Sequence, residues 1–229
     1  MSSLSVIVPV FNEQDFLSES LDRLISTNIA NQILICDDGS KDNSLEIAEN
    51  YKKKHPNVVV LTKQNNEGKG SALHIAKEAI TSEFVVIHDA DLEYSPNDLL
   101  EMLKFAERNK NYLILGSRFI GSKIRKNIYK RTLYANKFMS AFFSFVHNIA
   151  VSDVATCYKM MSSENFLKLN LNEKGFAIEI EILAKFLKVG AGVKEVPISY
   201  EGRTYQEGKK ITSKDGLRYL FTTIKYRIN

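Results

Sequence analysis

Residues 83–91 read Glu-Phe-Val-Val-Ile-His-Asp-Ala-Asp, a short apolar run that ends in two carboxylates. An uninterrupted apolar, β-branched run of this length is typical of a strand that is buried on both faces of a parallel sheet. Asp89 and Asp91 then leave the end of that strand. Similar runs predict further strands, and the set is Ser5–Val8, Gln32–Cys36, Asn57–Leu61, Glu83–His88 and Tyr112–Leu115.

Helical patterns separate these strands, because apolar residues recur there at intervals of three and four. Strands that alternate with helices through short loops indicate one α/β domain with a mostly parallel central sheet flanked by helices. The alternation fades from about residue 116, and the rest of the chain reads as helices and loops with a few short strands. The predicted helices are Gln14–Ser26, Asp42–Lys54, Gly70–Ile80 and Asn97–Asn109.

The composition is that of an ordinary globular protein. The chain has 229 residues, 44% hydrophobic and 25% charged, which is enough for one domain with a sizeable core. Cys36 and Cys157 form neither a disulfide framework nor a metal-binding spacing, so we expect a reducing compartment. The sequence shows no signal peptide and no apolar window long enough to span a membrane. These features together predict a cytoplasmic protein.

The net charge is only +4, but the cations are unevenly distributed. No acidic residue occurs between Glu107 and Asp153, whereas lysine and arginine are frequent there. Such a block is expected to seek phosphate on a lipid, a nucleic acid or a nucleotide. Between Lys123 and Val151 the cations alternate with aromatic residues, which is typical of a helix in a membrane interface or of one that packs its aromatic face on the core. These aromatic residues are Tyr129, Tyr134, Phe138, Phe142, Phe143 and Phe145.

Four loops that follow predicted strands carry polar motifs, and ligands bind at this edge of such sheets. Asp89–Asp91 suits a Mg²⁺ or Mn²⁺ ion beside phosphate, or it is a turn before Pro96. Asp37–Ser40 suits a contact with a base or ribose, or it is an Asp-Gly turn. Gly68–Gly70 suits phosphate at a helix start, or it is a plain turn, and it lacks P-loop spacing. The fourth loop is Pro9–Glu13.

Taken in order, these four loops resemble the motifs of family 2 glycosyltransferases, most closely the polyprenol (dolichyl) phosphate mannosyltransferase and glucosyltransferase branch. The resemblance covers nearly the whole chain. It implies a single GT-A type nucleotide-sugar-binding domain over residues 1–229, with a nucleotide-binding half at 1–118 and an acceptor and closing half at 119–229. Further matching segments are Gly116–Arg118, Cys157–Lys159, Gly175–Phe176 with Glu179, and Val196–Ile198 with Arg203.

The resemblance also implies roles for single residues. Asp89 is implied to contact the ribose or the sugar, and Asp91 to bind a Mg²⁺ or Mn²⁺ ion beside the diphosphate. Glu93 stands where relatives often use a Gln as a second metal ligand. Arg203 and Lys209, in a basic loop, are implied to neutralise the leaving diphosphate. Nucleoside contacts are implied for Pro9, Phe11, Glu13, Cys36 and Asp37, and further donor contacts for Asp38, Lys69, Ala90 and Arg118.

Two glutamates differ on a helical wheel of residues 178–188. Glu181 shares a polar face with Lys185 and forms an i,i+4 pair with it, which predicts a surface role. Glu179 falls among apolar residues, where a carboxylate needs a partner or a chemical task, unless it only stabilises the helix N-terminus. Glu179 and Asp153 are the candidates for a general base if the acceptor is a hydroxyl group.

The resemblance implies a hexosyltransferase that moves mannose or glucose, with inversion, from a GDP- or UDP-sugar to a lipid-linked acceptor, polyprenyl phosphate. We expect a peripheral protein on the cytoplasmic face of a membrane, with or without a membrane-embedded partner, and no nucleic acid. Transfer to a hydroxyl in cell-envelope polysaccharide synthesis is an alternative. A sugar-nucleotide pyrophosphorylase would carry a glycine-rich basic loop where this chain has Pro9–Glu13. A non-enzymatic phosphate- or lipid-binding module is the remaining alternative.

Overall fold

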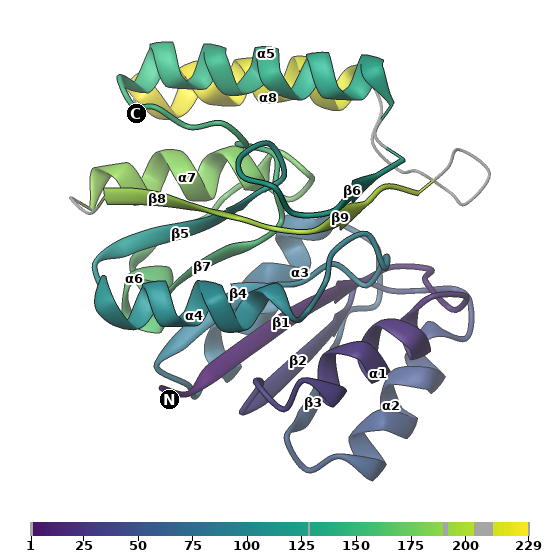
Figure 1. Ribbon diagram of the computed structural model, residues 1–229. Helices are drawn as coiled ribbons and strands as arrows, with labels where there is room; N and C mark the ends of the chain where they lie inside the picture. Colours follow the sequence, from purple (N-terminus) through teal and green to yellow (C-terminus); the bar gives the residue numbers. More distant parts are fainter. Residues whose placement is uncertain (1, 128, 190–191, 204–212, 229) are drawn as a thin grey trace.

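The computed structural model describes residues 2–127, 129–189, 192–203 and 213–228. A seven-stranded sheet in the order β3-β2-β1-β4-β7-β5-β8 forms its centre (Figure 1), and β6 pairs with β9 in a small second sheet. The strands are β1 Leu4–Val10, β2 Gln32–Asp37, β3 Val58–Thr62, β4 Phe84–Ile87, β5 Tyr112–Ser117, β6 Arg125–Lys126, β7 Lys159–Ser162, β8 Gly192–Pro197 and β9 Tyr200–Glu201. The helices are α1 Leu17–Ser26, α2 Ser44–Lys54, α3 Lys69–Ala76, α4 Asp98–Arg108, α5 Lys130–His147, α6 Ser163–Lys168, α7 Ile178–Lys188 and α8 Ser213–Ile228.

Parallel pairing dominates the central sheet, as the sequence predicts. β1 pairs in parallel with β2 and β4, β2 with β3, and β5 with β8. β7 is the exception, because it runs antiparallel to its neighbours β4 and β5. Since β1, β2 and β4 run in the same direction, the loops that follow them meet at one edge of the sheet, where ligands bind in folds of this kind.

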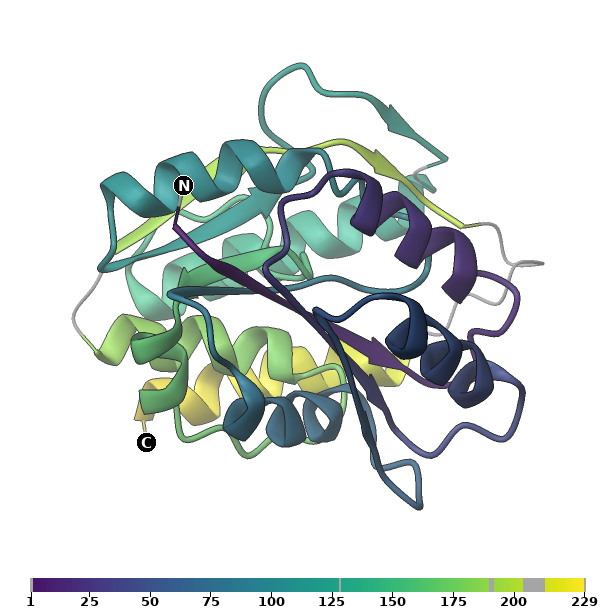
Figure 2. The same cartoon turned by 90° about the horizontal axis from the view of Figure 1, so that it is seen from below.

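Helices cover both faces of the sheet (Figures 1 and 2), which explains the continuous apolar runs in the sequence. Side chains alternate between the two faces along a strand. On β1, Val6 and Val8 pack with the buried residues of α1 and α4. Ile7 lies between them in the chain and packs on the other face with residues of α3 and α7. The strands are therefore apolar at consecutive positions because neither face is exposed.

The helix ends differ most from the sequence prediction. α1 begins at Leu17 rather than Gln14, because the Gln14 backbone N–H donates to Asp42 Oδ2 and so ties this segment to the loop before α2. α3 ends at Ala76 and continues as one 3₁₀ turn over Lys77–Ala79. Contacts between loops, which a periodic pattern does not register, set such ends.

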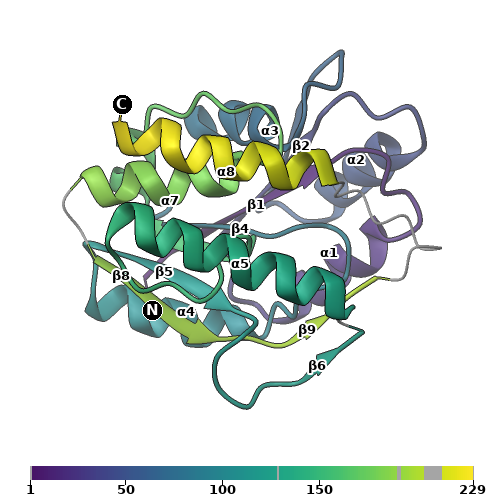
Figure 3. The same cartoon turned by 90° about the horizontal axis from the view of Figure 1, so that it is seen from above.

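α5 and α8 lie side by side and form a further layer over the domain (Figures 1 and 3). α8 also contacts α7, and its residues Tyr219 and Tyr226 belong to the core on that side of the sheet. Among the described residues, no helix has the length and apolar content needed to cross a bilayer.

Gly70→Ala is expected to destabilise the protein, because a β-carbon at Gly70 would lie 2.0 Å from the carbonyl oxygen of Glu173. We expect the free energy of unfolding to fall by about 1–3 kcal/mol, as in other overpacked sites. Gly216→Ala is the matched control, because a β-carbon there would meet nothing within 4 Å and Ala is favoured over Gly in a helix by about 1 kcal/mol. Urea unfolding of both variants checks this, and equal stability of Gly70→Ala and wild type would contradict it.

Candidate functional site

A cleft of about 760 Å³ opens at the carboxyl ends of β1 and β4 and reaches α5 and α8. This volume is within the range of ~300–1,000 Å³ that small-molecule sites occupy. The loops after β1, β2, β3 and β4 all contribute to its lining, so the motifs expected to converge do share one cavity. The sequence-predicted site residues that line it are Pro9, Phe11, Glu13, Asp38, Lys69, Asp89, Ala90, Asp91, Glu93, Arg118, Glu179 and Arg203.

Arg203 is a shared counter-ion for three carboxylates of the cleft. Its Nη1 lies 3.3 Å from Glu13 Oε2 and its Nη2 lies 3.2 Å from Asp91 Oδ2. Its Nε lies 3.9 Å from Glu93 Oε1. Burial and the neighbouring carboxylates of Glu93 and Asp89 raise the pKa of Asp91 to about 8. Three carboxylates, those of Glu13, Asp91 and Glu93, therefore share the single positive charge of Arg203.

A tight turn presents Asp91 to the cleft. Leu92 has a φ of 64°, in the left-handed region that non-glycine residues adopt at a cost. The Glu93 N–H donates to Asp91 Oδ1 at 3.1 Å and fixes that side chain. The Glu93 carboxylate in turn accepts the Tyr200 hydroxyl at 2.6 Å and the Arg203 N–H at 2.9 Å. The turn after β4 is thus fastened to the segment that contains β9.

The donor set at this turn fits a hard divalent cation that is shared with a substrate. Mg²⁺ and Mn²⁺ prefer oxygen ligands, and Mg²⁺ is usually held by one or two carboxylates together with phosphate and water. Within the described part of the chain, no cluster of three acidic, histidine or cysteine side chains is close enough to hold an ion alone. A cation would also relieve the crowding that raises the pKa of Asp91. Asp91 and Glu93 are the residues that would hold it.

Lys69 is a second buried cation at the bottom of the cleft, at the first turn of α3. Its Nζ lies 2.6 Å from Asp89 Oδ1 and 2.7 Å from Glu179 Oε1. Burial alone would lower the pKa of Lys69, but the carboxylates of Asp89 and Glu179 raise it well above its usual value. Lys69 is therefore an ammonium held between two acids, and Glu179 is buried as its place on the helical wheel predicts.

Asp37 and Asp38 differ although they are adjacent. Asp37 does not line the cleft, and its Oδ2 accepts the backbone N–H groups of Gly39–Ser40 at 3.1 Å each. This side chain adopts the turn alternative rather than the nucleoside contact. Asp38 does line the cleft, and its Oδ2 accepts the N–H groups of Glu67–Gly68 at 3.0 and 2.6 Å. Asp38 thereby joins the loops after β2 and β3.

Cys36 is buried in the core and not in the cleft. Its side chain is fully inaccessible and packs with Ala72 and Leu73 of α3 in one core cluster. Burial raises the pKa of the Cys36 thiol far above its usual range. The expectation of a nucleoside contact by this side chain is wrong, because Cys36 falls on the face of β2 that α3 covers.

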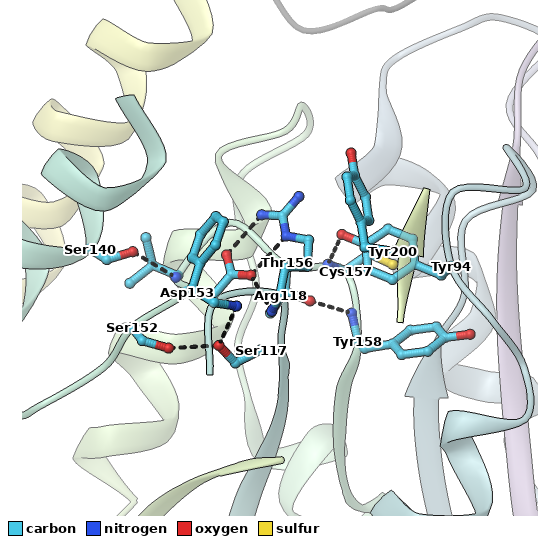
Figure 4. Close-up of polar contacts among 12 residues, drawn as sticks. Tyr94, Ser117, Arg118, Ser140, Ser152, Asp153, Thr156, Cys157, Tyr158 and Tyr200 are labelled. Atoms are coloured by element: carbon cyan, nitrogen blue, oxygen red, sulfur yellow. Dashed lines mark hydrogen bonds and ion pairs between the residues drawn. The ribbon is translucent and has the colours of Figure 1, made fainter. Parts of the chain in front are cut away.

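Asp153 binds Arg118 rather than facing a substrate (Figure 4). Its Oδ2 accepts the backbone N–H and the Nε–H of Arg118 at 3.0 and 2.7 Å, and its Oδ1 accepts Nη2 at 2.8 Å. Asp153 is fully buried and does not line the cleft, so the expectation of a general base there is wrong. Arg118 does line the cleft and lies 5.0 Å from the Tyr200 ring centre. Asp153 holds that guanidinium in place.

Glu181 is also buried, which corrects the surface role expected for it. The predicted pair with Lys185 forms at 2.7 Å. The two Glu181 oxygens, however, also accept the backbone N–H groups of Asn172 and Glu173 at 2.7 Å each. The segment before α7 covers this face of the helix, and a helical wheel cannot show such a cover.

The contribution of α5 and α8 to the cleft was missed from the sequence. Arg131 and Met139 of α5 line it, as do Leu217 and Leu220 of α8. The only sequence signal is helical spacing of apolar residues, which gives no indication of a cleft. Lys209 lies outside the described residues.

Asp153→Asn is expected to destabilise the protein, because it leaves the buried Arg118 guanidinium without its counter-ion. Breaking such a pair typically costs about 3–5 kcal/mol. Glu19→Gln is the control, because its pair with Arg23 is exposed and such pairs contribute ~0–1 kcal/mol. Urea unfolding measures both, and a similar small effect of the two substitutions would refute the role given to Asp153.

Comparison with known proteins gives a family and a set of relatives. Residues 5–169 match Glycosyl transferase family 2. Glycosyltransferase AglJ of Haloferax volcanii is 29% identical over 88% of this chain and 64% of that protein. The dolichyl-phosphate beta-glucosyltransferase of Dictyostelium discoideum is 28% identical over 91% of this chain and 68% of that protein. The dolichol-phosphate mannosyltransferase of Pyrococcus furiosus is 26% identical over 97% of this chain and 64% of that protein. The chain therefore spans about two thirds of the length of these relatives.

Among solved structures, glucosyl-3-phosphoglycerate synthase from Mycobacterium tuberculosis, crystallised with uridine diphosphate, superposes with a TM-score of 0.75. The superposition covers 99% of this chain and 80% of that one at 15% identity, and it shows the same GT-A-like fold. The family match extends over most of the chain and includes the loops after β1, β2, β3 and β4. On this basis the protein belongs to glycosyl transferase family 2.

Proposed function

We propose that this protein transfers a hexose, mannose or glucose, from a GDP- or UDP-sugar to a polyprenyl phosphate, with inversion at the anomeric carbon. The observation that carries the proposal is that half-buried carboxylates and cations meet in one cleft at the strand ends. A nucleoside diphosphate sugar calls for both, since carboxylates suit a metal ion and sugar hydroxyls while cations suit a diphosphate. The family and the names of the relatives support the same reaction class.

The donor is proposed to lie across the strand ends. The loop Pro9–Glu13 and Asp38 would contact the nucleoside, and Asp91 with Glu93 would hold the metal beside the diphosphate. A bound Mg²⁺ or Mn²⁺ would stabilise negative charge on the leaving diphosphate. Structural neighbours crystallised with Mn²⁺ or Mg²⁺ and uridine diphosphate support this arrangement. Arg203 pairs with Asp91, and Lys69 pairs with the neighbouring Asp89.

The acceptor is proposed to enter from the side of α5 and α8. Arg118 and Arg131 line that part of the cleft together with the apolar side chains of Met139, Leu217 and Leu220. A ligand with an anionic head and a hydrocarbon tail matches both features. Polyprenyl phosphate is such a ligand, and two of the relatives are named for dolichyl or dolichol phosphate.

The proposed transfer depends on positioning and charge rather than on proton removal. An acceptor phosphate oxygen attacks the anomeric carbon, while the bond from that carbon to the donor diphosphate breaks and the diphosphate leaves with the electron pair. A phosphate oxygen is already anionic near neutral pH, so no general base is needed. Lys69 and Arg203 would stabilise the charge on the departing group from fixed positions.

Transfer to a hydroxyl group, as in cell-envelope polysaccharide synthesis, is the second candidate. One observation favours it: Glu179 lines the cleft, and a hydroxyl acceptor would need such a base. A structural neighbour with this fold, glucosyl-3-phosphoglycerate synthase, was crystallised with phosphoglyceric acid, which is a small molecule without a lipid tail. Lys69 and Lys159 engage Glu179, however, and we therefore place this candidate second.

The outer surface of α5 and α8, here called the α5/α8 face, is proposed to contact the membrane. Neither α5 nor residues 216–228 contain an acidic side chain, and both carry lysine and arginine. An apolar face flanked by cations fits the anionic surface of the cytoplasmic leaflet. The large apolar side chains exposed on it are Tyr134, Phe138, Phe145, Leu217, Phe221, Ile224 and Ile228.

Asp91→Asn is expected to abolish hexose transfer, by about 100-fold or more, because it removes a ligand proposed for the metal. Little change in Tm is expected, because Arg203 keeps Glu13 and Glu93 as partners. Transfer from radiolabelled GDP-mannose and UDP-glucose to a short polyprenyl phosphate, with Mn²⁺, measures the effect. Glu164→Gln, at an exposed residue of α6, is the control. Full activity of Asp91→Asn would sink the proposal.

Phe145→Ser with Phe221→Ser is expected to weaken binding to vesicles that contain anionic lipid by about tenfold or more, because each aromatic ring buries apolar area worth ~1.5–3 kcal/mol. These side chains are 86% and 67% exposed and do not line the cleft. Sedimentation with vesicles measures binding, and Leu167→Ser on α6 is the control. Unchanged sedimentation of the double variant would show that the α5/α8 face is not the contact.

A further inference from the structure

Lys159 is a lysine with no access to solvent at the start of β7. Its Nζ donates to the carbonyl oxygens of Val154 and Thr156 and lies 2.5 Å from Glu179 Oε2. An ammonium has three N–H donors, and here each has an acceptor. Lys159 does not line the cleft, so it would act on a ligand through the groups that it holds, which are Glu179 and the carbonyls on either side of Ala155.

Glu179 carries the connection into the cleft. Its Oε2 faces Lys159, while its Oε1 lies 2.7 Å from Lys69 Nζ. Lys69 in turn contacts Asp89, so four alternating charges run from the core to the cleft. Lys69 Nζ is the partner of both Glu179 Oε1 and Asp89 Oδ1, and each carboxylate oxygen has a second lone pair that a ligand can use. Both residues line the cleft.

A purely structural ion pair on the same helix looks different. Glu181 pairs with Lys185 at 2.7 Å, but it also accepts two backbone N–H groups and does not line the cleft. Its oxygens are satisfied within the protein. Among the described residues, Glu179 is held by the two lysine ammonium groups and by no backbone N–H, and its remaining lone pairs on the cleft side can accept donors from a ligand.

We propose that Lys159 is a positioning residue, which holds Glu179 so that Glu179 and Asp89 accept hydrogen bonds from the hydroxyl groups of the donor's hexose. The proposal rests on the proposed function and assigns the sugar part of the donor to this end of the cleft. Lys159 fixes one oxygen of Glu179 and leaves the other for the ligand. Without Lys159, the Glu179 carboxylate would turn toward Lys69. Lys69 would then bind Glu179 more closely and Asp89 less closely than in the wild type.

Lys159→Met tests this, because it keeps the length of the side chain and removes the charge. Isothermal titration calorimetry, with Mn²⁺ present, measures the affinity for a sugar nucleotide and for the same nucleotide without its sugar. The two pairs are UDP-glucose with UDP and GDP-mannose with GDP, and the variant is tested with the pair that the wild type binds. We expect the sugar nucleotide to bind about 10- to 100-fold more weakly, the loss typical of a charged hydrogen bond. The diphosphate without sugar should change by less than about twofold.

Lys185→Met is the matched control, because it breaks the same kind of pair on the same helix away from the cleft. It should leave both affinities within about twofold of the wild type, as expected for an independent site. Equal losses for sugar nucleotide and diphosphate in Lys159→Met, or no loss at all, would overturn the positioning role.

A double-mutant cycle with Glu179→Gln completes the test. In the Glu179→Gln background, Lys159→Met should cause little further loss of preference for the sugar nucleotide, and an additive loss would contradict the proposal. If Lys159→Met does not fold, Glu179→Gln alone carries the test, and an unchanged preference there overturns it. A wild type that binds no sugar nucleotide would instead refute the proposed function, and this inference with it.

Discussion

Crowded carboxylates at the carboxyl edge of the sheet are the constraint on which the site depends. Glu13, Asp91 and Glu93 come from two different loops, yet all lie within 3.9 Å of one guanidinium. Like charges a few ångströms apart repel by about 1 kcal/mol in water and by several times more where solvent is excluded. The loops therefore need a cation in order to close, and Arg203 supplies it from 110 residues beyond Glu93. A residue from the second half of the chain, Arg203, thus holds together the loops of the first half.

The second half of the chain also gives the cleft an apolar wall, through α5 and α8. Phe138 and Leu217 both line the cleft, yet they are 61% and 70% exposed. Apolar surface is therefore continuous from the interior of the cleft to the α5/α8 face, beside the guanidinium that Asp153 holds. Large exposed apolar areas usually mark a partner or a membrane. A ligand whose head is anionic and whose tail stays in a bilayer would use the whole of this surface, whereas a small soluble acceptor would leave most of it exposed.

The sequence predicts the strands and the meeting of their loops, because burial on both faces leaves an apolar run that needs no knowledge of partners. It also predicts that Glu179 is buried. It fails for Glu181, because periodicity shows which face a side chain occupies and not what covers that face. It also fails for Cys36 and Asp153, because a resemblance or a candidate role assigns a position in the chain and not the direction of the side chain. The order of Asp37 and Asp38 is a similar case: adjacent residues at a strand end point to opposite sides, and only the fold decides which of them faces the cleft.

The contrast between Glu179 and Glu181 separates function from packing. Both are buried glutamates of α7 that pair with lysine, but backbone N–H groups also bond Glu181, whereas among the described residues Glu179 has only the ammonium groups of Lys69 and Lys159 as partners and faces the cleft. Phosphate near neutral pH offers acceptors and could not donate to this carboxylate, but a sugar hydroxyl can donate to it. The end of the cleft at Lys69 is thereby suited to the hexose, and the end at Arg118 and Arg131 to a phosphate. Carboxylates that can accept hydrogen bonds at one end and guanidinium groups that can donate them at the other give the cleft its direction.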